Sequence, residues 1–239
     1  AAEPACIAPE PAVGGVRAAP PPSLSAALAA GAAPWLGDRC YPPGHDLLVQ
    51  GQAGEAFFVI AEGWAAQYEL LKDGRRQILD FLLPGALAGF QPDAATPSPC
   101  SIQALTGVAA RCFSRRGFVE AAAGNPTLAL ELAALAAKSQ ARLLRRLTLI
   151  GRRSAKERVA TLLLELYCGV RMASPRARGD AVAVPLTQEH LGDALGLTNV
   201  HVNRMLRELR EERVLVLRGG VLRVLDPDRL VEIAGHEPA

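Results

Sequence analysis

The sequence lacks the features that would place it in a membrane or in an oxidising compartment. No apolar run approaches the roughly 18 residues that suggest a membrane span. The five cysteines are odd in number, and no two of them have the C-x-x-C spacing of a zinc site or a redox pair. We therefore predict a soluble cytoplasmic protein with free thiols.

Catalytic and metal-binding motifs are also missing. The sequence contains no nucleophile elbow, no P-loop and no dinucleotide-binding fingerprint. Its four histidines, His45, His190, His201 and His236, do not have the spacing of metal ligands. We therefore expect neither an enzyme nor a bound metal or other cofactor.

Charge is distributed unevenly along the chain. Residues 1–110 carry 5 basic and 10 acidic side chains, a net charge of −5, whereas residues 111–239 carry 21 and 14, a net charge of +7. The densest basic segment, 138–158, holds eight basic side chains and one acidic one. A basic half indicates a polyanionic partner, although a charge run is also common on a solvated helix face.

The first half of the chain divides into a leader and a predicted β-domain. Residues 1–22 are rich in Ala and Pro, and we expect a disordered leader that runs into a short helix near Ser23. From about residue 46 to 113, short apolar runs alternate with Gly, Pro and Asp, with a turn at Lys72-Asp73-Gly74. This pattern predicts a β-sandwich or barrel within residues 23–126.

A long helix is predicted for residues 127–150. Its apolar residues recur at spacings of three and four, which is typical of a helix that packs along one stripe. The stripe can cover the core of its own domain or form a seam between two copies. We favour the seam, because the helix is longer than one small sandwich can cover. The predicted dimer interface consists of Leu128, Leu132, Leu135, Ser139, Leu143, Leu147 and Ile150.

A second domain is predicted for residues 151–239, after a break at 151–153. Ser154 and Glu157 have the S-x-x-E spacing of a capping box, which opens an apolar helix. The segment MASPRARG at 172–179 is predicted to be a loop.

Two short helices follow in LTQEHLGDALGLTNVHVNRMLRELR, residues 186–210. Thr187 is placed to cap the first helix, and Thr198 to cap the second, predicted over 199–212. Gly196 between them can adopt the positive φ that stops and reverses the chain. The first helix then braces the second, as in a helix-turn-helix motif that enters the DNA major groove. The outward face of the second helix offers Asn199, Val200, His201, Asn203, Arg204 and Arg207.

The segment VLVLRGGVLRVL, residues 214–225, alternates with period two around Gly219-Gly220. Two strands joined by a two-residue glycine turn make a hairpin, which here would be the wing of a winged helix. The alternative is an ordinary helical pair followed by a hairpin. The helix pair, the wing and the basic neighbourhood together favour DNA binding.

This combination resembles the Crp/Fnr superfamily of bacterial transcription regulators, from about Leu36 to the end. LTQEHLGDALGLTNVHVNRMLRELREE is its most specific part. YELLKDGRRQILDFLLPGALAGF is similar to the family's cyclic-nucleotide-binding-type sandwich, and LIGRRSAKERVATLLLEL to its FixK-like branch, which lacks iron-sulfur cysteines. The resemblance implies an α+β fold: an amino-terminal β-sandwich (jelly roll), a long dimerisation helix and a carboxy-terminal winged helix-turn-helix. It also implies a homodimer that binds a pseudo-palindromic site on double-stranded DNA and contacts RNA polymerase.

The resemblance also implies roles for single residues of the second helix. Thr198 matches a phosphate-contacting cap, and Arg204 matches an arginine that reads guanine or a neighbouring phosphate. Val200 stands where most members have a glutamate that accepts from cytosine, so it can make only apolar contacts. The usual half-site is therefore not assumed. We expect base contacts from Arg204, Asn203, His201, Asn199 and Val200, and phosphate contacts from Thr187, Gln188, Thr198 and Arg207.

The predicted sensor domain departs from family members that bind cyclic AMP. Ala86 follows Pro84-Gly85 where those members have a glutamate for the ribose, and their Arg-Ser pair for the cyclic phosphate aligns with Ser98-Pro99. A buried phosphate would lack its cationic partner there. We therefore expect no dependence on cyclic AMP, and the small-molecule effector is unknown. The proline-rich segment 91–99 leaves two alternatives open, a sealed pocket or a pocket of different shape.

Sensing through iron-sulfur chemistry or a thiol is not favoured. Cys6 stands alone, whereas an amino-terminal cluster needs several closely spaced cysteines. Cys112 is expected to be a small core residue, and neither it nor Cys168 has a cationic pocket evident in the sequence. An alternative function is a cyclic-nucleotide-like ligand-binding or protein-interaction module without sequence-specific DNA binding.

Overall fold

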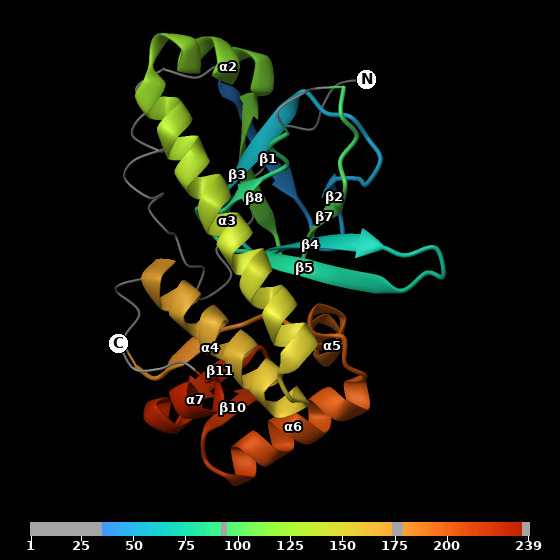
Figure 1. The fold of residues 1–239 in the computed structure, drawn as a ribbon, viewed down its shortest axis with the longest axis vertical. Helices are drawn as coiled ribbons and strands as arrows, with labels where there is room; N and C mark the ends of the chain where they lie inside the picture. The colour runs from blue at the N-terminus through green and yellow to red at the C-terminus, as the bar shows by residue number, and fades with distance from the viewer. Residues whose placement is uncertain (1–34, 92–94, 174–178, 236–239) are drawn as a thin grey trace. The chain divides into compact units, whose positions relative to one another are not determined.

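The computed structural model describes residues 35–91, 95–173 and 179–235 (Figure 1). Its contacts divide the chain into two compact units, one of Ala1–Leu70 with Phe81–Gln140 and the other of Leu71–Asp80 with Ala141–Ala239. The leader predicted for 1–22 and the short helix near Ser23 lie outside the described residues. Within the described ranges, no helix is long and apolar enough to span a bilayer.

Eight short strands form the two sheets of the predicted β-sandwich, which is confirmed. The strand orders are β1-β8-β3-β6 and β2-β7-β4-β5. The pairs β1–β8, β3–β8, β3–β6, β2–β7 and β4–β7 are antiparallel. The first strand precedes residue 46, where the predicted strand pattern begins. The bounds are β1 Trp35–Tyr41, β2 Asp46–Leu48, β3 Ala56–Glu62, β4 Ala65–Leu70, β5 Arg76–Leu82, β6 Leu87–Ala88, β7 Ser101–Ala104 and β8 Val108–Ser114.

Two helices follow β8. The first, α2 at Arg115–Gly124, is capped by Ser114, whose side chain accepts a hydrogen bond from the backbone N–H of Gly117 at 3.2 Å. It was not predicted. The second, α3 at Pro126–Arg152, confirms the helix predicted for 127–150. It continues through Gly151, where a break was predicted, because an exposed helical glycine costs only about 1 kcal/mol relative to alanine.

The central strand β3 explains how the first unit is held together. Successive side chains of a strand point to opposite faces. Phe58 and Ile60 therefore enter the cluster between the two sheets, whereas Phe57 enters a second cluster with Phe118 of α2 and Leu128 of α3. The rings of Phe57 and Phe118 meet edge to face with centroids 5.5 Å apart. The strand is thus apolar on both faces because helices cover the outer one.

The second unit contains the predicted helix-turn-helix and hairpin. Figure 1 shows α5 and α6 next to each other on one side of it. A short strand, β9, pairs with β11 and extends the hairpin to three strands in the order β10-β11-β9. The bounds are α4 Ala155–Ala173, β9 Ala181–Ala183, α5 Gln188–Leu195, α6 Asn199–Glu211, β10 Leu215–Arg218, β11 Val221–Val224 and α7 Pro227–Ile233. The predicted loop at 172–179 begins later than expected, since α4 runs to Ala173.

The cysteines differ from the expectation at one position. Cys100, Cys112 and Cys168 are free, as predicted, but Cys40 takes part in a disulfide. Burial raises the pKa of the Cys112 thiol to about 11, so this thiol stays protonated at neutral pH. Among the described residues, no group of His, Cys, Asp or Glu is arranged to hold a metal ion.

Candidate nucleic-acid interface

The first turn of α5 is fixed by a capping box with histidine in the third helical position. The Thr187 hydroxyl accepts from the backbone N–H of His190 at 3.1 Å, and the backbone N–H of Thr187 donates to His190 Nδ1 at 3.3 Å. Capping boxes more often use Glu or Gln at that position. Burial, and then the nearby Arg76, lower the pKa of His190, which keeps Nδ1 free to accept. Thr187 therefore caps the start of α5, as predicted.

The turn between α5 and α6 is tight enough to require glycine at two positions. Gly196 has φ 64° and donates its backbone N–H to the Gly192 carbonyl, which ends α5. The backbone N–H of Leu197 reaches the same carbonyl at 3.1 Å. At Gly192, an added Cβ would lie 2.6 Å from the Leu197 oxygen. The turn thus packs directly onto α5, and the two helices are held close together.

The recognition helix α6 has a buried face and an exposed face, as predicted. The hydroxyl of Thr198 caps it by accepting from the backbone of His201 at 3.3 Å. Val202, Met205 and Leu209 are buried, whereas Val200 is 77% exposed. The residues predicted to contact DNA all lie on the exposed surface of this motif: Thr187, Gln188, Thr198, Asn199, Val200, His201, Asn203, Arg204 and Arg207.

Two arginines of α6 are paired with glutamates one turn further along. Arg204 lies 3.8 Å from Glu208, and Arg207 lies 3.9 Å from Glu211. These are loose contacts between side chains that are largely exposed, and such pairs contribute about 0–1 kcal/mol. Both guanidinium groups can therefore turn to DNA at little cost.

A side-chain hydrogen bond links the two helices on this exposed surface. Asn203 Nδ2 of α6 donates to Gln188 Oε1 of α5 at 3.2 Å. The sequence predicted both residues as DNA contacts but not their contact with each other.

The hairpin predicted as a wing has the expected turn. Gly219 and Gly220 have φ values of 58° and 73°, a conformation that a tight two-residue hairpin requires and that side chains disfavour. Leu222 is fully buried, whereas Arg218 and Arg223 are exposed. The wing thus adds two basic side chains to the surface of the second unit.

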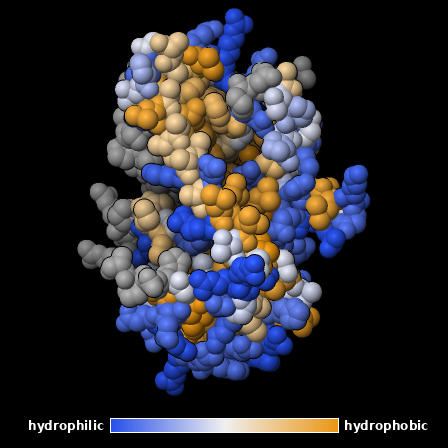
Figure 2. All heavy atoms as spheres, viewed as in Figure 1, coloured by the Kyte–Doolittle hydropathy of each residue, from blue (hydrophilic) through white to orange (hydrophobic). Residues whose placement is uncertain are grey.

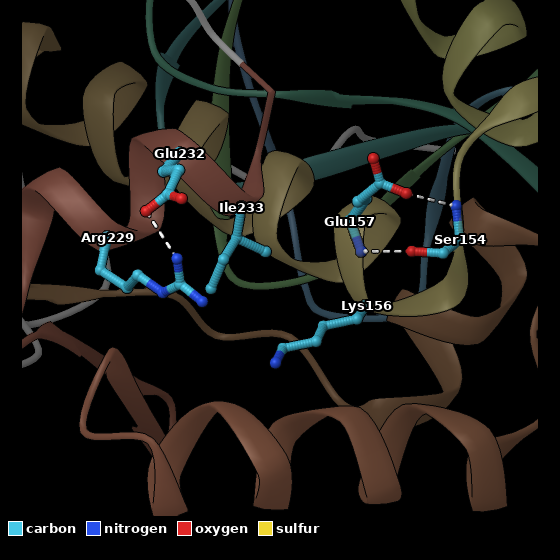
Figure 3. A pocket seen from close by; sticks show the side chains of 6 residues that line it. All are labelled: Ser154, Lys156, Glu157, Arg229, Glu232 and Ile233. Carbon is cyan, nitrogen blue, oxygen red and sulfur yellow. Dashed lines mark hydrogen bonds and ion pairs between the residues drawn. The ribbon is translucent and has the colours of Figure 1, made fainter.

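The predicted capping box at the start of α4 is confirmed (Figure 3). The backbone N–H of Ser154 donates to Glu157 Oε2 at 2.8 Å, and the backbone N–H of Glu157 donates to Ser154 Oγ at 3.4 Å. These bonds to Ser154, with a contribution from Arg153, lower the pKa of Glu157 to about 2.

A shallow pocket lies beside this cap, lined also by Lys156, Arg229, Glu232 and Ile233. Its cations are already engaged within the protein. Lys156 pairs with Glu212 of α6's carboxy-terminal cap. Arg229 pairs with Glu232 at 2.6 Å, as Figure 3 shows. Each of the two cations is thus matched by a carboxylate of the same chain.

Sequence reasoning missed the contacts that residues 71–80 make with α5 within the second unit. Arg76 Nε donates to Asp193 Oδ2 at 2.8 Å, and Gln77 Nε2 donates to the Asp193 carbonyl at 2.8 Å. These residues are about 117 positions apart in sequence, so no local pattern could have indicated the contact. The helix α7 was also missed, although Asp226, its cap, followed by Pro227, is a typical helix start.

Comparisons with known proteins agree with this geometry. A Crp-like helix-turn-helix domain matches residues 157–233, and a cyclic nucleotide-binding domain matches residues 38–125. The nitrogen fixation regulation protein FixK of Rhizobium meliloti is 31% identical over 204 residues, which are 84% of this chain and 90% of that protein. The transcriptional activatory protein AadR of Rhodopseudomonas palustris is 32% identical over 196 residues, 81% of this chain and 80% of that protein.

A solved structure supports the same assignment. FixK2 from Bradyrhizobium japonicum superposes with a TM-score of 0.75 at 28% identity, covering 85% of this chain and 98% of that one. The two domain matches, the relatives and the exposed recognition helix lead to one conclusion. This chain belongs to the Crp/Fnr family of DNA-binding transcription regulators.

Proposed function

We propose that the protein acts as a homodimer on a two-fold symmetric promoter site of double-stranded DNA, where it acts with RNA polymerase in the bacterial cytoplasm. The observation that carries this proposal is the exposed polar and basic face of α6, capped at Thr198 and braced by α5. Arg204, Asn203, His201, Asn199 and Val200 are proposed to contact bases. Thr187, Gln188, Thr198 and Arg207 are proposed to contact phosphates, which set the register of the protein on the duplex.

The proposed dimer surface keeps Leu147 of the stripe predicted from sequence but differs from it elsewhere. Leu128 and Leu132 are buried in the core of their own chain, and Leu135 packs against that core. Leu128 and Leu132 are therefore not available to a second copy. Ser139 and Ile150 are partly buried, and Leu143 is 39% exposed.

An exposed heptad stripe lies along a neighbouring face of α3. Its spacings alternate between three and four, which is the pattern of a two-helix seam. Leu130 and Leu147 are each 71% exposed, and Leu144 is 58% exposed. Figure 2 shows hydrophobic side chains along the face of α3 that is turned to the viewer. The proposed dimer surface consists of Leu130, Ala133, Ala137, Gln140, Leu144 and Leu147.

Replacing Leu147 with glutamate is expected to dissociate the dimer, because the change places two like charges in an apolar seam. Analytical ultracentrifugation should show a monomer at micromolar concentration, with DNA affinity reduced in parallel. The control is Val119→Glu on α2, at a residue that is 55% exposed and off the stripe. A Leu147→Glu protein that remains a dimer would contradict the proposed surface.

We propose that cyclic AMP is not required. The Ser98 hydroxyl, which the family resemblance aligns with the phosphate site, is buried and donates to the Cys100 carbonyl at 2.7 Å. The backbone of Ser98 is held on both sides, by Gly51 at 2.8 Å and by Gln52 at 2.9 Å. Pro99 has no backbone N–H to donate. The hydroxyl and backbone groups of Ser98, which would lie at the phosphate of a cyclic nucleotide, are thus already hydrogen-bonded within the protein.

The experiment that tests the proposed function is selection of DNA from a random pool by the purified protein without added ligand. We expect a two-fold symmetric site. Affinity for it should fall roughly 10³-fold between 50 and 200 mM salt if about six phosphates are neutralised. Enrichment of no sequence, with or without cyclic AMP, would contradict the proposal, and a flat salt response would contradict its electrostatic part.

A further inference from the structure

The hydrogen bond between α5 and α6 has a direction that bears on base recognition. Gln188 Oε1 is the acceptor, and Asn203 Nδ2 is the donor, at 3.2 Å. Both side chains are exposed, on the surface proposed to face DNA. From this bond we infer that Gln188 is a positioning residue, which fixes the amide of Asn203 so that it reads adenine. The inference rests on the proposed function and deepens it.

The hydrogen-bonding groups of the asparagine amide match those that adenine presents in the major groove. The group has one carbonyl acceptor and two N–H donors. When Gln188 accepts from the N–H of Asn203 that lies trans to the carbonyl oxygen, the carbonyl and the cis N–H remain side by side on the other edge. Adenine presents the matching pair in the major groove, an N6 amino donor and an N7 acceptor. Guanine presents two acceptors there and cannot donate to the carbonyl.

A DNA phosphate beside Gln188 would favour the amide orientation seen in this hydrogen bond. A DNA phosphate can only accept hydrogen bonds, so a phosphate beside Gln188 would take the amide nitrogen. The amide oxygen must then point the other way, where it accepts from Asn203 Nδ2. The phosphate and Asn203 would thus contact opposite ends of the Gln188 amide, and each contact favours the other.

The backbones that carry the two side chains are fixed independently of this bond. Gln188 is the first residue of α5, directly after the cap formed by Thr187 and His190. Asn203 lies in the second turn of α6, next to the fully buried Val202. Changing either exposed amide should therefore leave the fold intact, which circular dichroism and thermal melting would verify.

Two substitutions separate the two ends of the Gln188 amide. Gln188→Glu keeps the acceptor for Asn203 but removes the donors for phosphate. Gln188→Arg keeps donors for phosphate but removes the acceptor. Asn203→Ala identifies the half-site position that Asn203 reads. Each purified protein is used for selection from the same random DNA pool, and affinities for the selected site and its single-base variants are then measured.

We expect the Asn203→Ala protein to lose a preference for adenine at one position of each half-site. Gln188→Arg should weaken the preference at that same position by roughly fivefold or more, the lower end of what a bidentate contact provides, and leave other positions unchanged. Gln188→Glu should keep the adenine preference while it lowers affinity for all sequences alike. If Gln188 only anchored phosphate, the Gln188→Arg protein would keep its full adenine preference at that position.

Three outcomes would overturn the inference. The first is that the preference lost in the Asn203→Ala protein is for a base other than adenine. The second is that the Gln188→Arg protein keeps its full preference at that position. The third is that the Gln188→Glu protein loses this preference as completely as the Asn203→Ala protein does. Failure of the proposed function looks different, because the wild-type protein itself would then enrich no two-fold site.

Discussion

Replacing Arg204 with alanine is expected to abolish most of the site-specific affinity. A bidentate arginine contact to guanine contributes ~1 to 3 kcal/mol of discrimination, and a homodimer makes the contact twice. The loss for the selected site should therefore be roughly 30-fold to 10⁴-fold. Non-specific binding should weaken far less, since only one positive charge per protomer is removed. Fluorescence anisotropy with the selected site and with a scrambled duplex measures both quantities.

The chain offers a matched control for this substitution. Arg116 of α2 is 91% exposed and pairs with Glu120 four residues later, as Arg204 pairs with Glu208. Arg116→Ala thus removes the same charge and the same kind of helix ion pair, but outside the helix-turn-helix. It should leave affinity for the selected site nearly unchanged. Equal losses in both variants would show that Arg204 contributes only general charge, and the assigned recognition face would be wrong.

The DNA-binding motif could be predicted from sequence because its determinants are local. Thr187 and Thr198 cap their helices from within three residues, and Gly196 ends α5 by its own positive φ. Ser154 and Glu157 close their capping box over the same short distance. Such patterns act through neighbouring backbone groups, so they do not depend on the rest of the fold.

The dimer stripe could not be assigned in the same way. The helix α3 is rich in Leu and Ala on more than one face, and two stripes fit a spacing of three and four. Leu128 and Leu132 became part of the core because α3 covers one face of β3. Leu147, which belongs to the predicted stripe, and Leu130, which does not, both stayed exposed. Which face of α3 is buried therefore depends on how the helix packs on the β-sandwich, not on the helix sequence alone. The contacts of Arg76 and Gln77 with α5 were missed for the same reason, since they join segments distant in sequence.

Replacing Gly192 with alanine is expected to disrupt the helix-turn-helix and its DNA binding. The new Cβ would lie 2.6 Å from the Leu197 oxygen and 3.5 Å from Asn199 Oδ1. The first of these is a backbone atom in a tight turn, so α6 and its preceding turn must move away from α5. Overpacking of this kind costs about 1–3 kcal/mol, against which the better helix propensity of alanine contributes only about 1 kcal/mol.

The effect on DNA binding should exceed the effect on stability, because the shift separates Gln188 from Asn203 and misaligns the whole reading face. We expect the selected site to be bound at least about tenfold more weakly at a temperature where the protein remains folded. The control is Gly124→Ala at the end of α2, where an added Cβ meets nothing within 4 Å. Gly124→Ala should leave DNA affinity unchanged. It should leave the melting temperature unchanged or raise it slightly. If Gly192→Ala behaved like Gly124→Ala, the close packing of the turn on α5 would not be what positions the recognition helix.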